Sequence, residues 1–570
     1  MAHWVGFSDA VVGQDFERYR PRPIELAPLP QVPNLAKPAP IVQPSDEVLV
    51  AQWDAVIVRD DPQRVRTDQA FETATGVEYD LTRSGTWVPQ ASLTPVITES
   101  LGGPITLRRL NDLSARIVKF YRQQGRPMVD VVIPEQKITG GTVQIVLVES
   151  LVGAIQIQGN AISSTKRLSD LIQCTQTGGP IEESRLQQDL FRLNEYPFRR
   201  VELDLKPGSA YGTTDVFLNV HDRLPLQAYV GYDDTGVQAL NYERVMAGFT
   251  LGSLQGNDSV LNYQATGDGN LHRLQAHSVV YQKPIGACHW FETYGSWAEV
   301  DPRVALPVSQ EGQSWQTGFA IGQRLSHRPN DQRSLALGFD FKNTNTNVEF
   351  GGVNVFGSSA ELATLRLSYR DFQRFENDEY RIVRNDLIVG PGGGLTGSHN
   401  AAAFQTIRPG TSPDFVYNKL SYERLRNLPQ GWQWIGRGSG QVSSERLLFS
   451  EMLGLGGFDS VRGYDQRSLN ADAGWFLNLE IGPQPWTFGT GRGIGQVRAY
   501  GFVDFGESYL LDSLPGEDRY SFIASTGLGT RVSMNDNLTL RVDYGYGLED
   551  DIVPRHHRIH VGLIRQFGSR

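Results

Sequence analysis

The amino-acid sequence predicts an antiparallel β-barrel membrane protein of about 16 strands, preceded by two small α+β domains. Three observations support this fold class. Apolar and polar residues alternate along many segments after residue 225, which places them on opposite faces of strands. The chain holds 60 Gly and 10% aromatic residues, a composition typical of many-stranded folds. Helical periodicity precedes residue 225 and is not found beyond it, so the helices belong to a separate part.

The composition excludes several classes of protein. Mean hydropathy is -0.33 and 20% of the residues are charged. No stretch approaches the roughly 18 uninterrupted apolar residues of a membrane helix, which excludes a polytopic helical membrane protein. The net charge of -10 disfavours nucleic acid as a partner, because phosphate binding needs clustered Lys and Arg. Two cysteines, Cys174 and Cys288, are too few for a disulfide framework or a four-ligand zinc site.

The first 44 residues differ from the rest of the chain. Residues 21–44 contain eight prolines, which block helix and sheet and favour an extended polyproline II segment. We expect a semi-rigid linker between residues 1–20 and everything after it, with a frayed terminus as the alternative. No basic segment followed by an apolar one opens the chain, so no signal peptide is visible. The expectation is either a cytosolic chain or a mature form.

Short strands and amphipathic helices alternate between this linker and residue 225. Thr106 is a suitable N-cap for a helix with apolar residues at spacings of three and four, and Gly125 marks its end. Two strand-like segments follow, and the same order then recurs. Two β-α-α-β-β domains, at residues 45–150 and 151–225, are the simplest account.

The remainder, residues 226–570, fits either a soluble β-sandwich or a membrane barrel. Alternation is clear at 335–342, 363–370 and 538–546. In a sandwich the apolar face forms the core, whereas in a membrane barrel it faces lipid and the polar face lines the lumen. About 16 strands of roughly 10 residues, with short and long connections in turn, account for this length. Arginines and acidic residues on the polar strand faces favour the barrel.

Four motifs follow one another along the chain. They are Pro134-Glu135-Gln136-Lys137-Ile138 with Gly141; Asn194 and Pro197 with Pro207-Gly208 and Gly212 to Asp215; Leu455-Gly456-Gly457 with Val461-Arg462-Gly463-Tyr464; and Phe502-Val503-Asp504-Phe505-Gly506. The first two resemble signatures of the two POTRA domains of two-partner-secretion transporters. The last two resemble the V-R-G-Y/F loop and the F-x-D-x-G strand of the POTRA-barrel superfamily. The chain is identified as a member of the TpsB-type outer-membrane transporters, the haemolysin/haemagglutinin secretion-activation proteins.

The resemblance implies an outer-membrane pore that exports a secreted exoprotein partner without nucleotide. It implies a plug helix at 1–20, a linker at 21–44, POTRA domains at 45–150 and 151–225, and a 16-stranded barrel at 226–570. The POTRA domains are expected in the periplasm, with the signal peptide removed from the chain. Outer-membrane lipid and the barrel-assembly machinery are the other expected partners, since the last strand carries the terminal aromatic Phe567.

The same resemblance implies an ion pair inside the barrel, between Arg462 of the loop and Asp504 of the strand. Arginine is always charged and offers a rigid fork to a carboxylate. Alternation places Glu480 on the lumenal face, where it joins the pair. The expected loop–barrel lock consists of these three residues with the loop neighbours Val461, Gly463 and Tyr464. The alternative is a surface arginine without a fixed partner.

Client capture is expected in the second POTRA domain. Such domains bind extended clients by adding a strand to a sheet edge, with a helix groove alongside. The candidate residues lie on the helix and at the start of the strand that follows it: Arg185, Leu186, Leu190, Arg199 and Arg200. A solvated helix face is the alternative for each arginine.

No enzyme motif survives inspection. There is no G-x-x-x-x-G-K-[ST], and the glycine-rich run Gly489–Gly495 lacks the G-x-G-x-x-G spacing. His556 and His560 are separated on a strand by about 13 Å, too far to share a metal ion. We therefore expect no catalytic residues, cofactor or metal. The alternatives to an export pore are a barrel-assembly insertase of the same superfamily and a soluble β-rich binding module.

Overall fold

The computed structural model describes residues 21, 45–67, 74–82, 86–138, 140–303, 308–350, 353–490, 493–535, 537–549 and 557–568. The expected plug helix at residues 1–20 and all of the linker except Pro21 lie outside the described residues. The chain divides into two compact units. Among the described residues, one comprises residues 45–222 and the other contains residues 223–568.

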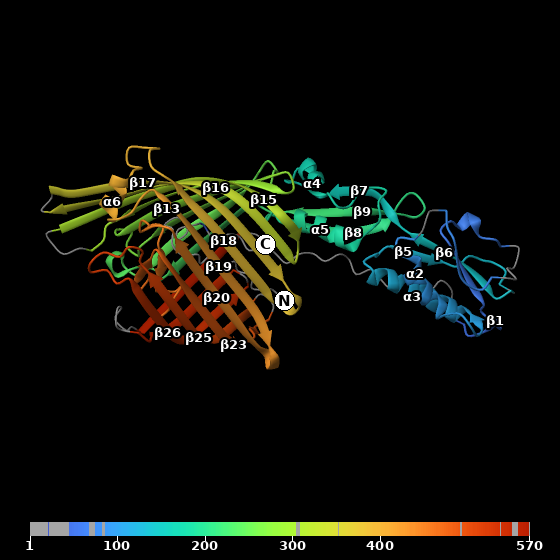
Figure 1. The fold of residues 1–570 in the computed structure, drawn as a ribbon. Helices are drawn as coiled ribbons and strands as arrows, with labels where there is room; N and C mark the ends of the chain where they lie inside the picture. Colours follow the sequence, from blue (N-terminus) through green and yellow to red (C-terminus); the bar gives the residue numbers. More distant parts are fainter. Residues whose placement is uncertain are drawn as a thin grey trace. The chain divides into compact units, whose positions relative to one another are not determined.

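The unit of residues 45–222 contains two small α+β domains (Figure 1). The elements of the first are β1 (Val48–Val50), β2 (Ala55–Arg59), η1 (Pro62–Arg64), β3 (Gly76–Asp80), α2 (Gln90–Thr98), β4 (Ile105–Thr106), α3 (Leu107–Gln123), β5 (Val129–Val132) and β6 (Thr142–Glu149). The elements of the second are β7 (Leu151–Gln158), α4 (Thr165–Leu171), α5 (Glu183–Leu193), β8 (Arg199–Pro207) and β9 (Thr213–Asp222).

The first domain is a sheet of order β3-β2-β6-β5 packed against α2 and α3. Strand β3 pairs in parallel with β2 and adds an edge that the β-α-α-β-β pattern did not predict. A two-stranded ribbon of β1 and β4 completes the domain. The core lies between the helices and the sheet and includes Trp53, Leu113, Ile117 and Ile145.

The helix predicted after Thr106 is present as α3. The Thr106 hydroxyl accepts a hydrogen bond from the Arg109 amide, and Gly125 takes the left-handed conformation, with φ of 71°, just past the end. One face of α3 is buried, which follows from the three-and-four spacing of its apolar residues.

The first motif has a structural role in this domain. The Gln136 side chain pairs with the backbone of Gln144 in β6: its Nε2 donates to the carbonyl at 2.7 Å and its Oε1 accepts from the amide at 2.7 Å. Gly141 has φ of 72°, and a Cβ there would lie 2.8 Å from the carbonyl oxygen of Gln52. The glutamine and the glycine therefore fix the loop that leads into β6.

The second domain is a three-stranded sheet of order β7-β9-β8 with α4 and α5, and its elements follow one another as β-α-α-β-β along the chain. Asp189 of α5 is buried, and its carboxylate accepts the amides of Gln173, Cys174 and Thr175 at 2.7–3.0 Å. At the end of β9, burial alone raises the pKa of Asp222, but hydrogen bonds from the Ser163 side chain and nearby amides outweigh it and lower the pKa.

Among the described residues, no helix is both long and apolar enough to cross a membrane.

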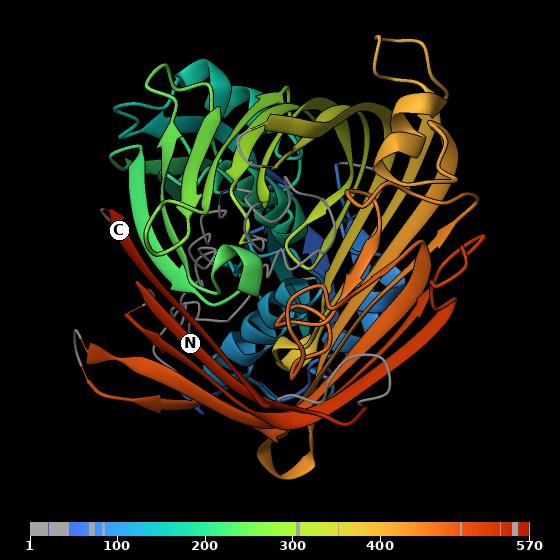
Figure 2. The same ribbon diagram turned by 90° about the vertical axis from the view of Figure 1, so that its left-hand side faces the viewer.

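The other unit contains a closed antiparallel β-barrel (Figures 1 and 2). Its strands are β10 (Leu226–Asp233), β11 (Arg244–Gly252), β12 (Val260–Gly267), β13 (Leu274–Ile285), β14 (His289–Val300), β15 (Val308–Arg328), β16 (Asp331–Phe350), β17 (Val353–Arg374), β18 (Tyr380–Pro391), β19 (Asp414–Leu428), β20 (Trp432–Ser443), β23 (Ala473–Pro483), β24 (Trp486–Phe488), β25 (Gly495–Tyr509), β26 (Tyr520–Met534), β27 (Leu538–Gly547) and β28 (His557–Gly568). Strands β23 and β24 both pair with β25 and form one interrupted strand, so the described residues build a 16-stranded barrel. β28 pairs with β10 and closes it.

The two ends of the barrel differ in the length of the connections between strands. At the end where β10 begins, short turns such as 329–330 and 429–431 join the strands. At the opposite end, which we call the distal end, the connections include 392–413, 444–472 and 510–519. The first of these contains α6 (Ala401–Ile407), which the sequence did not predict because its seven residues are too short for a periodic signal. The second contains a ribbon of β21 (Leu453–Leu455) and β22 (Leu469–Ala471).

The polar faces of the strands are the enclosed ones. Leu337 is 61% exposed and Leu365 is 44% exposed on the outside of the barrel. Asp340 and Arg366, from the same two strands, are enclosed, with their side chains 3.2 Å apart. A soluble sandwich would enclose its apolar face, so this arrangement contradicts that alternative and agrees with a membrane barrel.

We predict that Asp189→Ala destabilises the second α+β domain by about 1–3 kcal/mol, because it leaves three backbone amides without their acceptor. The measurement is urea unfolding of the purified full chain in detergent, followed by the helical circular-dichroism signal. Asp204→Ala is the control, since Asp204 forms only an exposed pair with Lys206 at 3.5 Å. Equal unfolding midpoints for the two variants would contradict the capping role of Asp189.

Candidate functional site

The candidate site lies at the tip of the connection between β20 and β23. Figure 2 looks into the barrel from the distal end and shows this connection, in orange, inside the ring of strands. Its ribbon, β21 with β22, ends at Gly456 and Gly457, both with φ of 98°. Val461 and Tyr464 are fully buried and Arg462 is 2% exposed. The V-R-G-Y motif is therefore enclosed by the barrel.

Arg462 is bound to Asp504 by three hydrogen bonds. The guanidinium Nε and Nη2 donate to the two carboxylate oxygens, each at 2.8 Å, and the Arg462 amide donates to Oδ2 at 3.1 Å. The predicted pairing of these two residues is thus present in the structure. A bidentate fork fixes the orientation of the guanidinium as well as its position.

Two further carboxylates meet the same guanidinium. Arg462 Nη1 lies 3.0 Å from Glu480 on β23 and 3.4 Å from Asp543 on β27. The ring of Phe502, from β25, lies under the guanidinium carbon at 3.5 Å from its centroid, a cation–π contact. The loop tip is therefore tied to three strands at once.

The side chains around Arg462 form a network with equal numbers of positive and negative groups. The network contains four arginines and four carboxylates: Arg437, Arg462, Arg498, Arg531, Glu423, Glu480, Asp504 and Asp543. Glu480 accepts from Arg498 at 2.9 Å, and Asp543 accepts from Arg531 at 2.8 Å and from the Tyr500 hydroxyl at 2.6 Å. Removal of one member of a buried network leaves an uncompensated charge, at a cost of about 3–5 kcal/mol.

The loop neighbours of Arg462 fill the remaining contacts. Val461 packs with Leu455 and Ile523, and a Cβ at Gly506 would lie 2.8 Å from the Val461 side chain. This contact explains the glycine of the F-x-D-x-G motif. The Tyr464 hydroxyl lies 3.0 Å from the Ala524 carbonyl oxygen and accepts from the Glu549 amide at 3.0 Å.

Backbone contact with β27 is the feature that sequence reasoning missed. Gly463 has φ of 94°, and a Cβ on Gly545 would lie 2.5 Å from the Gly463 nitrogen. A Cβ on Gly547 would lie 2.9 Å from the Tyr464 ring. The sequence signal for this contact lies in residues 541–547. There two glycines and an acid, Asp543, Gly545 and Gly547, share one face of a strand. The same holds for Arg437, Arg498 and Arg531, whose lumenal positions follow from alternation.

The client-capture candidates fall into two groups. Leu186 and Leu190 are each 3% exposed and belong to the domain interior, and Arg199 is buried, with Nε donating to the Leu193 carbonyl at 2.8 Å. Their burial removes these three from a surface that a client can reach. Arg185 and Arg200 remain accessible, since each forms only a partly exposed ion pair.

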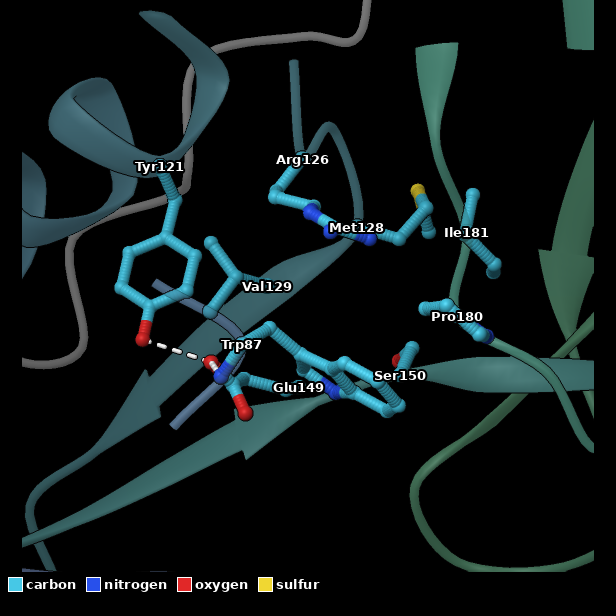
Figure 3. Close-up of a pocket in the computed structure, with 9 residues that line it drawn as sticks. All are labelled: Trp87, Tyr121, Arg126, Met128, Val129, Glu149, Ser150, Pro180 and Ile181. Carbon is cyan, nitrogen blue, oxygen red and sulfur yellow. Dashed lines mark hydrogen bonds between the residues drawn. The ribbon is translucent and has the colours of Figure 1, made fainter. Parts of the chain in front are cut away.

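A small pocket lies at the joint between the two α+β domains (Figure 3). Arg126, after α3, donates to Glu182 of the second domain at 2.9 Å and lies 5.7 Å from the ring centroid of Trp87. Glu149 accepts from the Tyr121 hydroxyl at 2.6 Å and from the Trp87 amide at 2.7 Å. Side chains from both domains therefore hold this joint.

Comparison with known proteins identifies the family. Residues 212–532 match the family described as haemolysin secretion/activation protein ShlB/FhaC/HecB. The chain belongs to this family. Residues 77–150 also match the ShlB-type POTRA domain, so the first α+β domain of this transporter is a POTRA domain. The predicted family and fold class are confirmed.

Several relatives cover most of the transporter. The hemolysin transporter protein ShlB of Serratia marcescens is 24% identical over 468 residues, 79% of this chain and 78% of that protein. The heme/hemopexin transporter protein HuxB of Haemophilus influenzae is 23% identical over 420 residues, 71% and 72% of the two chains. Among solved structures, CdiB from Escherichia coli has a TM-score of 0.61 at 16% identity, covering 93% of this chain and 94% of that one. BamA from Haemophilus ducreyi has a TM-score of 0.54 at 14% identity, covering 85% and 98%.

The close backbone approach at β27 yields a prediction. Gly545→Ala is expected to displace the loop tip, because its Cβ would lie 2.5 Å from the backbone nitrogen of Gly463. Trypsin digestion of the purified barrel should then cleave after Arg462, a site that wild type protects by burial.

Gly501→Ala is the matched control. Gly501 lies in β25, and a Cβ there would meet its neighbours at 3.9 Å, an ordinary contact. Protection after Arg462 that equals wild type in both alanine variants would contradict the importance of this contact.

Proposed function

We propose that this transporter is an outer-membrane pore that moves a partner exoprotein from the periplasm to the cell surface. Its two α+β domains lie in the periplasm and capture the client in an extended form. The observation that carries the proposal is the loop tip bound through Arg462 to three carboxylates inside the barrel. Membership of the haemolysin secretion/activation family and the names of the transporters ShlB and HuxB support it.

The loop–barrel lock holds the loop tip in one position inside this pore. A loop tip held by Asp504, Glu480 and Asp543 fixes the relative positions of β23, β25 and β27 from within. Arg462 therefore links the loop tip inside the lumen to the barrel wall. No catalytic step is assigned to the chain in this proposal; export relies on capture, passage and folding of the client outside.

Client capture is assigned to the free edge of the second α+β domain. β8 is an edge strand of the order β7-β9-β8, and α5 packs beside it. An extended segment can add to this edge through backbone hydrogen bonds. Arg185 on α5 and Arg200 on β8 place positive charge along the proposed path, which favours a client segment with acidic residues.

A barrel-assembly insertase of the same superfamily is the competing function, because BamA shares the fold. The family match covers residues 212–532 and favours secretion over insertion. The two functions differ in their clients: one dedicated secreted protein for the export pore, and many barrel precursors for the insertase.

We predict that Arg462→Ala abolishes export while the barrel still inserts. The substitution leaves Asp504, Glu480 and Asp543 without their shared cation, whereas the closed strand ladder is untouched. Secretion of the partner into the medium is measured beside heat-modifiable gel mobility, which reports a folded barrel. Arg519→Ala is the control, because Arg519 is exposed at the distal end and its guanidinium donates to the Tyr509 hydroxyl, outside the Arg462 network. Normal secretion by a folded Arg462→Ala barrel would overturn the lock.

A photo-crosslinking probe tests capture. Placed at Gln187, exposed on α5, the probe should form adducts with one large secreted protein in living cells. The same probe at Gln156, exposed on the opposite edge strand β7, is the matched control and should give fewer adducts. Mass spectrometry identifies the clients. Adducts with a range of barrel precursors would support the insertase, and stronger adducts at Gln156 would move the capture edge to β7.

A further inference from the structure

The base of the β20–β23 connection is anchored separately from its tip. Residues 446–452 follow β20 at the distal end, and Asp472 immediately precedes β23. Helix α6 lies in the neighbouring β18–β19 connection. We call α6 together with residues 446–452 the distal cover. None of these residues belongs to the Arg462 network.

Asp472 joins four segments of the chain. Its Oδ1 accepts from Arg408 Nη1 and from the Leu447 amide, at 2.5 and 2.9 Å. Its Oδ2 accepts from Arg408 Nη2 and from the Leu511 amide, at 3.1 and 3.0 Å. A carboxylate offers about four acceptor sites, and here all are used. The carboxylate is fully buried.

Glu451 provides a second anchor for the same cover. Its Oε1 accepts from Lys342 of β16 at 2.5 Å, and its Oε2 accepts from the Tyr417 hydroxyl of β19 at 2.7 Å. The Gln441 side chain of β20 donates to the backbone carbonyls of both Glu451 and Asp472, at 3.0 and 3.2 Å. The two anchors are therefore linked through one wall residue.

The cover hides an apolar area on the inner wall of the barrel. Phe404, Leu447, Leu448 and Met452 of the cover pack against a set of inward-facing wall residues. The wall set is Ala360, Leu362, Ile388, Phe415 and Tyr417. Further along the same strands the lumenal positions become polar, as at Thr364 and Lys419, which is the usual character of a wet lumen. The apolar inner wall at the mouth therefore forms the surface on which the cover packs.

A third pair ties the cover to the next connection. Arg446 donates to both carboxylate oxygens of Glu517 at 2.8 and 2.9 Å. Hydrogen bonds from this guanidinium lower the pKa of Glu517 to about 2, so the pair stays ionised at the pH of growth.

We propose that Asp472 and Glu451 hold the distal cover against the inner wall at the distal mouth of the barrel, where it narrows the opening as a permeability seal that is separate from the Arg462 lock. The lock sets the loop tip within the lumen, and the two acidic anchors keep α6 and residues 446–452 on the wall. The seal limits the passage of ions and small solutes through a pore that must otherwise be wide enough for a polypeptide.

The test is ion conductance of the purified full chain in planar lipid bilayers. Asp472→Asn replaces an acceptor oxygen with an NH2 group that faces donors, so the carboxylate junction opens and single-channel conductance should rise several-fold. Glu451→Gln, which disrupts the Lys342 contact, should raise it as well. Asp301→Asn is the matched control: Asp301 forms an exposed pair with Arg273 at the distal end, away from the cover, and its variant should conduct like wild type.

Two further measurements keep the result interpretable. Heat-modifiable mobility shows whether each variant is a folded barrel, and Arg408→Lys is the milder variant if Asp472→Asn does not fold. Arg408→Gln combined with Asp472→Asn should conduct no more than the larger single variant, because both remove one contact. Wild-type conductance in the folded Asp472 or Arg408 variants together with Glu451→Gln overturns the seal, as does a full rise in Asp301→Asn. Conductance requires no client, so this outcome is independent of whether the chain exports an exoprotein.

Discussion

An arginine enclosed by a barrel wall must be met by carboxylates, because it keeps its charge at all pH values of growth and has little water around it. Arg462 meets this condition with Asp504, Glu480 and Asp543, which come from three separate strands. The geometry of the loop tip follows from that requirement. Glycines at 463 and 545 accompany this arrangement, since a Cβ on Gly545 would lie 2.5 Å from the Gly463 nitrogen.

The same connection is anchored at its base by the opposite arrangement. At the tip, one loop cation gathers carboxylates from the wall. At the base, one carboxylate, Asp472, gathers donors from three other segments, and Glu451 reaches Lys342 across the wall. The tip and the base are therefore held by separate groups of side chains.

Much of the fold was predictable because it depends on local periodicity. The α3 cap at Thr106, the order of elements in the second domain and the alternation of the barrel strands all appear in the structure. The pairing of Arg462 with Asp504 was predictable only through motif resemblance. Strand β3 and helix α6 were missed, since short elements leave little periodic signal. Leu186 and Leu190 were expected to contact a client, but both are buried in the domain interior. Helical spacing shows that they share an apolar face, but it does not show whether that face packs inside the domain or binds a client.

The sequence by itself determined the class of fold and the side of each strand that faces the lumen, because period-two alternation acts between near neighbours. Only the tertiary structure decided which lumenal groups meet. Asp543 lies 81 residues from Arg462 and Asp472 lies 64 residues from Arg408, and closure of the barrel brings each pair together. Such contacts depend on strand register and on how the connections fold inward, which no local pattern encodes.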